Sequence, residues 1–129
     1  MHIPLAMLSL LLALGSFAQG VQIPMPQPND KNWKYLATSD DGNDILYMPK
    51  ISYGNDREIW WFVRDRDPSK EININLERYN CEIGASRLLR VDSYLRNEFV
   101  TSSSFDKDDW GYAETKTIGQ LLLKAACGQ

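Results

Sequence analysis

The sequence predicts a small α+β domain, mainly β-structure with one C-terminal helix, closed by a disulfide bond. Three observations predict it. Short runs of strand-forming residues alternate with clusters of Gly, Asn, Asp and Pro; the spacing becomes helical near the C-terminus; and two cysteines follow an export-like N-terminus. The chain has 129 residues, which suits a single hydrophobic core.

Residues 1–18 have the pattern of a cleaved signal peptide. The apolar run over residues 5–14 is too short to span a bilayer, and small residues at Ser16 and Ala18 suit a cut after Ala18. The segment before this run contains no Lys or Arg, and the alternative is a buried N-terminal helix. Since no later segment is apolar enough to span a membrane, we expect a periplasmic or secreted protein.

A Pro-rich leader is expected over residues 19–32, ahead of a domain over residues 33–129. Pro24, Pro26 and Pro28 occur at alternate positions, which favours extended structure without hydrogen bonds. We therefore expect this leader to be flexible or loosely draped. No Cys directly follows the predicted cut, so the sequence offers no site for a lipid anchor there.

The first half of the domain predicts a hairpin followed by a central strand. Residues 33–38 and 44–48 are rich in strand formers, and the turn-forming cluster at residues 40–43 separates them. Residues 57–64 contain two Trp and two β-branched residues around a continuous apolar centre. Such a centre predicts a middle strand with both faces partly covered.

The second half predicts further strands. Ile72, Ile74 and Leu76 alternate with polar residues, so one face of this strand is buried, and the apolar phase is expected to slip near Arg78. Residues 86–94 read as another strand. Residues 101–105 fit either an edge strand or a loop.

Residues 117–128 predict an amphipathic helix. Thr117 is the expected N-cap, with Gln120 three residues later, and Gly128 suits the position after the last turn. Five apolar residues fall on one side at helical spacing: Ile118, Leu121, Leu122, Ala125 and Ala126.

Cys81 and Cys127 are expected to form a disulfide bond, because an exported chain reaches an oxidising compartment. Closing this loop stabilises the fold by roughly 4 kcal/mol in the chain-entropy model. The bond would tie the end of the helix to the sheet. The alternative, two free buried thiols, requires that the chain is not exported.

The residue types limit the chemistry. The single histidine, His2, lies in the predicted signal peptide, so a mature chain would lack imidazole for nucleophilic catalysis or metal binding. A formal charge of −3 gives no electrostatic basis for binding nucleic acid. We expect no enzyme activity, no cofactor and no metal. One catalytic alternative is a carboxylate pair, drawn from Asp65, Asp67, Glu71, Glu77, Glu82, Asp106, Asp108 and Asp109.

Five residues are candidates for a binding surface. Trp60 and Trp61 are adjacent in a strand and point to opposite faces, so one of them is a candidate exposed contact, the alternative being that both are covered. Arg87, Arg90 and Arg96 form a local basic excess that could meet an acidic partner such as a sulfated glycan, the alternative being a solvated strand face.

Several short motifs resemble the surface-adhesin protein E family of Gram-negative bacteria. They are Trp33-Lys-Tyr-Leu, the Asp-Gly hairpin, Ile59-Trp-Trp-Phe, Tyr79-Asn-Cys81, Trp110, and the terminal helix ending Ala-Ala-Cys127. The resemblance implies a six-stranded, mostly antiparallel sheet with a C-terminal helix packed on it and joined by the Cys pair. It also implies export and, as in the best-known member, a homodimer that binds host matrix proteins.

Two departures affect what this resemblance implies. Asn80 stands where the family often has Asp, and the missing lipid-anchor site puts surface display in doubt. The sequence therefore predicts an exported, non-catalytic protein-binding domain. An adhesin-like binder of host matrix proteins is the first hypothesis, and a soluble periplasmic partner of the inhibitor or immunity type is the alternative.

Overall fold

A computed structural model describes residues 25–50, 54–114 and 117–128. The predicted signal peptide, its cut after Ala18 and the first part of the leader lie outside the described residues. Among those described, no helix is long and apolar enough to cross a membrane.

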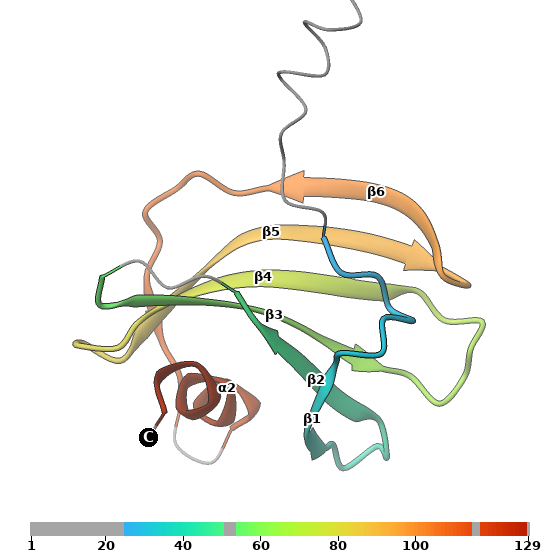
Figure 1. Cartoon of the computed structure of the whole chain (residues 1–129), viewed down its shortest axis with the longest axis horizontal. Coiled ribbons are helices and arrows are strands. Elements are labelled where there is room, and N and C mark those ends of the chain that lie inside the picture. Colours follow the sequence, from blue (N-terminus) through green and yellow to red (C-terminus); the bar gives the residue numbers. More distant parts are fainter. Residues whose placement is uncertain (1–24, 51–53, 115–116, 129) are drawn as a thin grey trace, which may run out of the picture.

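The strands form one antiparallel sheet in chain order, with a helix at the C-terminus (Figure 1). Each strand pairs with the next, and a short seventh strand runs beside the start of β5. The elements are β1 (Lys34–Thr38), β2 (Asp44–Pro49), β3 (Asp56–Arg64), β4 (Ile72–Asn80), β5 (Ala85–Leu95), β6 (Glu98–Ser104), β7 (Gly111–Tyr112) and α2 (Ile118–Cys127). The predicted fold class, with six antiparallel strands and a C-terminal helix, is confirmed.

Tight turns give this sheet its up-and-down order. The predicted β1–β2 hairpin is present, and Gly42 in its turn has a φ of 84°, a left-handed conformation that glycine adopts without strain. The β5–β6 turn consists of Arg96 and Asn97, both with positive φ. This is the two-residue turn geometry that matches the twist of paired strands. The edge strand β6 thus begins earlier than the sequence indicated.

One face of the sheet, here called the leader face, carries the larger core. Its buried residues are Leu46, Trp60, Phe62, Ile74, Leu76 and Tyr94. Met25 and Trp33 pack against them, and Pro26 and Pro28 are buried. The described part of the leader, residues 25–32, is therefore packed onto the domain rather than loosely draped, because its apolar side chains cover a face that the helix leaves open.

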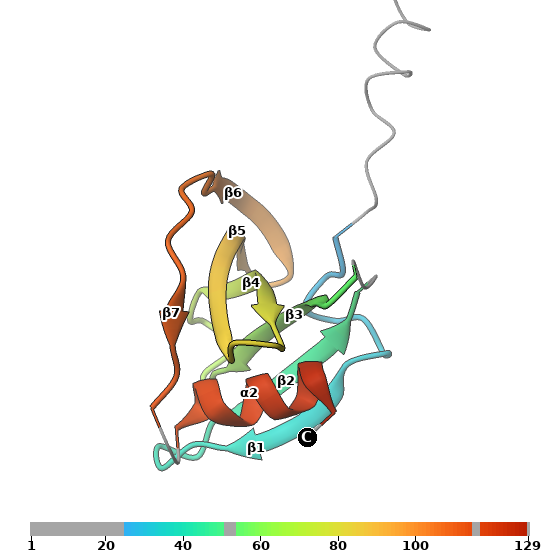
Figure 2. The same cartoon turned by 90° about the vertical axis from the view of Figure 1, so that its left-hand side faces the viewer.

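The opposite face, here called the helix face, is covered in part by α2. Helix residues Leu122 and Leu123 pack on Ile59 and Tyr79, and the helix contacts β1, β3 and β4 (Figure 2). The predicted N-cap is present, since the Thr117 hydroxyl accepts a hydrogen bond from the Gln120 backbone N–H at 3.3 Å. Leu121 was predicted on the buried side but is 40% exposed, because the contact is centred on Leu122 and Leu123.

Strand β4 explains the predicted slip of the apolar phase. Its pairing with β3 continues without a register shift from Asn75 to Asn80, so the strand itself is regular. Leu76 points to the leader face, whereas Tyr79, three residues later, points to the helix face. The burial changes side because α2 covers the far end of the strand, and the bulge lies in β5, opposite Leu76 and Glu77.

Candidate functional site

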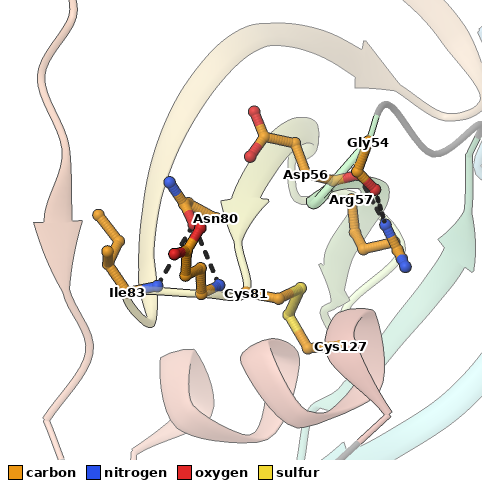
Figure 3. Close-up of a disulfide and its surroundings, with 8 residues drawn as sticks. Gly54, Asp56, Arg57, Asn80, Cys81, Ile83 and Cys127 are labelled. Carbon is orange, nitrogen blue, oxygen red and sulfur yellow. Dashed lines mark hydrogen bonds between the residues drawn. A yellow bond between two sulfur atoms is a disulfide. The ribbon is translucent and has the colours of Figure 1, made fainter.

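The predicted disulfide bond is present between Cys81 and Cys127 (Figure 3). Cys81 follows β4 directly, where the Asn80 side-chain oxygen accepts hydrogen bonds from the backbone N–H groups of Glu82 at 3.1 Å and Ile83 at 3.3 Å. Gly84 completes this turn with a φ of 72°. The turn presents the sulfur to the last residue of α2, so the bond fixes the helix against the sheet.

The two candidate tryptophans lie on opposite faces, as adjacent strand residues must. Trp60 is only 7% exposed on the leader face, and its indole N–H points to the Met25 sulfur at 3.0 Å. Trp60 is therefore a core residue and presents little surface to a partner. Trp61 is half-buried on the helix face, where one part of its ring borders the α2 core.

The three candidate arginines do not form one surface. Arg87 lies near the start of β5 and Arg96 follows its end, which separates them by roughly 30 Å along the strand. Arg87 donates to the Lys107 carbonyl at 2.7 Å and lies over the Trp110 ring. Arg90 is paired with the buried Asp92 at 2.8 Å, and Arg96 occupies the β5–β6 turn.

Two buried carboxylates on the leader face are paired with positively charged side chains. Glu58 is 2% exposed and accepts hydrogen bonds from Lys50 at 2.9 Å and from Arg78 at 2.6 Å. Asp92, equally buried, accepts from Arg90 and from the Ser102 hydroxyl. A buried carboxylate requires such partners to remain ionised. These groups hold neighbouring strands together.

The helix face holds a polar cluster beside its core. The Glu77 carboxylate accepts hydrogen bonds from the Trp61 indole N–H at 2.9 Å and from the Ser86 hydroxyl at 2.6 Å. Burial, together with the negative charge of Glu77, raises the pKa of the neighbouring Tyr79. The Tyr79 hydroxyl is buried and lacks a partner in hydrogen-bonding geometry among the described residues.

The sequence identified the edge strand β6 only in part. All seven of its residues are exposed, including Phe99 at 56% and Val100 at 57%. The inner edge of β6 pairs with β5, and no described strand pairs with its outer edge. The sequence indicated an edge strand or loop here, but register and exposure follow from the β5–β6 turn, which no residue pattern identified.

Within the described ranges, no group of three or more His, Cys, Asp or Glu residues could hold a metal ion. Comparisons with protein-family models, with curated proteins and with solved structures give no match to this chain. Any assignment of function therefore rests on the residues of this chain and their geometry.

Proposed function

We propose that this chain is an exported, non-catalytic binding domain that holds a partner protein through the outer edge of β6. The observation that carries the proposal is an edge strand of seven residues, all of them exposed, with two large apolar side chains among them. Such an edge presents a row of unpaired backbone N–H and C=O groups, which an extended segment of another protein can pair with as an added strand.

The composition of β6 favours this use. Proteins usually protect an edge strand from pairing with Lys, Pro, inward-pointing charges or a β-bulge. In β6 the pairing with β5 shifts register at Val100, so a bulge lies near the start of the strand and the regular edge runs over residues 101–104. Strand β6 reads EFVTSSS and carries one charge, on Glu98 at its start. Phe99 packs edge-on against Tyr94 with ring centroids 5.8 Å apart but stays 56% exposed, so both Phe99 and Val100 offer apolar surface to a partner.

The resemblance to the surface-adhesin protein E family supports a partner of one kind, a host extracellular matrix protein. The disulfide bond supports a location outside the cytoplasm, since such bonds persist in oxidising compartments. Delivery by a signal peptide ending at Ala18 is part of the same proposal.

Substituting Val100→Lys tests the proposal, because a charged side chain on the edge opposes strand addition. We expect the oxidised mature domain to bind at least one of a panel of immobilised matrix proteins, and Val100→Lys to weaken that binding about tenfold or more, the range of a truncated contact residue. Ile83→Lys is the matched control, since Ile83 is also exposed, at 50%, but lies in the β4–β5 turn. Surface plasmon resonance measures both.

Equal losses in the two variants, or none in either, would show that β6 is not the binding edge. Failure to bind any matrix protein, with β6-dependent capture of a periplasmic protein instead, would favour the soluble periplasmic partner over the adhesin.

A further inference from the structure

A shallow cavity of about 320 Å³ lies on the helix face, at the end of β3 and β4 away from the disulfide. It is lined by one aromatic ring, one aliphatic side chain, two carboxylates and two carboxamides: Trp61, Val63, Asp65, Glu71, Asn73 and Asn75. The cavity adjoins the polar cluster around Glu77 but is not part of the β6 edge.

The aromatic ring in this cavity is held in place. Trp61 packs on the α2 core, and its indole N–H donates to Glu77, whose other oxygen accepts from Ser86. Asn75 lies directly opposite Trp61 in the β3–β4 pairing, and its amide donates to the Trp61 carbonyl at 3.3 Å. The helix contact and the indole hydrogen bond hold the ring, and the Asn75 amide holds only the backbone beneath it. A ring held in this way loses little freedom when a ligand stacks on it.

The polar groups around the ring retain hydrogen-bonding capacity. The Asn73 side-chain oxygen accepts from the Ser93 hydroxyl at 2.7 Å, which orients the carboxamide. Its amide N–H₂ has no partner among the described residues, and neither does the Glu71 carboxylate. The cavity thus offers two oriented carboxamides and, among the described residues, unpaired carboxylate acceptors beside an indole.

We propose that this cavity is a binding site for a neutral pyranose sugar. A hexopyranose has an apolar C–H face that can lie on the Trp61 ring and a rim of hydroxyls, each both donor and acceptor, that match carboxamides and carboxylates. Asp65 and Glu71 select against sulfated or sialylated sugars, because like charges repel across a short distance. This cavity would therefore take a neutral sugar, whereas the three candidate arginines would suit an acidic partner.

The neutral sugar can come from a bacterial wall or from a host glycan. Two probes distinguish the sources: triacetylchitotriose, which has wall-type N-acetylglucosamine units, and N-acetyllactosamine, which ends in galactose. NMR titration of the ¹⁵N-labelled, oxidised domain is the measurement. We expect one or both sugars to shift the Trp61 indole and the Asn73 and Asn75 side-chain signals, and a heparin oligosaccharide to leave them unchanged.

Variants give the test its controls. Asn73→Ala and Trp61→Phe should each raise the dissociation constant about threefold to tenfold, as expected for one lost hydrogen bond or a smaller stacking surface. Asn29→Ala and Trp110→Phe, at exposed or half-exposed positions elsewhere, should leave it unchanged. Trp61→Phe could loosen the contact between α2 and the sheet and so weaken binding indirectly. Asn73 is exposed, so Asn73→Ala tests the site without disturbing the core.

The outcomes separate this site from the proposed function. No shift with either sugar, or equal weakening by the control variants, would overturn the sugar site. Normal sugar binding by Val100→Lys would support a site independent of β6. Cleavage of the chitotriose would support the sugar site and overturn the non-catalytic function.

Discussion

Tyr79 shows how one side chain sets a pH dependence for the whole fold. Burial, with the charge of Glu77, raises its pKa above the ordinary value of 10.0. Above about pH 10 the unfolded chain releases this proton while the folded chain retains it, so stability is full below that pH and falls as the pH rises further.

Tyr79→Phe removes both the titrating group and a buried hydroxyl without a hydrogen-bond partner. We expect the free energy of unfolding at neutral pH to be unchanged or higher by about 1 kcal/mol, and the alkaline loss of stability to become smaller. Urea titrations across the alkaline range measure this. Tyr112→Phe, at a position 72% exposed, should keep the wild-type profile; a steeper alkaline loss in Tyr79→Phe would contradict the assignment.

Individual candidate residues were predictable in type but not in placement. The alternation of a strand places Trp60 and Trp61 on opposite faces, and this much the sequence settles. Which face is open depends on what covers it, and the leader covers Trp60. A bulge in β5 places Arg87 and Arg90 on the same face of the sheet. Strict alternation along the strand would place them on different faces. Cross-strand partners such as Trp61 and Asn75 depend on register, which the sequence did not reveal.

Among the elements, α2 depends on a narrow contact with the sheet. Leu122 is 2% exposed against Ile59 and Tyr79, whereas Leu121, its neighbour on the helix, is 40% exposed. Leu122→Ala should lower the free energy of unfolding by about 3 kcal/mol through lost burial and a cavity. Leu121→Ala should change it by less than about 0.5 kcal/mol. Denaturant titration under oxidising conditions compares them, and equal effects would contradict the described helix register.

Elements with strong local signals were predicted well. The β1–β2 hairpin has turn residues between two strand-forming runs, β3 has its aromatic centre, and α2 has a cap at each end. The packed leader and β7 have no such signal, because a Pro-containing segment and a two-residue strand gain their stability from tertiary contacts alone. The start of β6 was missed because Arg96 and Asn97 lack the glycine that usually marks this turn.

At the scale of the molecule, one sheet is buried from both sides by different means. The leader packs on one face and α2 on the other, and only the helix is tied to the sheet by a disulfide bond. The bond between Cys81 and Cys127 closes a loop with a sequence separation of 46, which stabilises the fold by roughly 4 kcal/mol in the chain-entropy model. That is a large share of the ~5–15 kcal/mol typical of a whole domain. A reducing environment would therefore weaken the fold that presents β6 and the Trp61 cavity.

The most direct test of export and disulfide closure is mass spectrometry of the protein isolated from the cells that produce it. The protein is alkylated before any reductant is added. We predict a mature chain that begins at Gln19, with neither cysteine alkylated until the sample is reduced. A chain that retains residues 1–18 and carries an alkyl group on both Cys81 and Cys127 would contradict export and closure together.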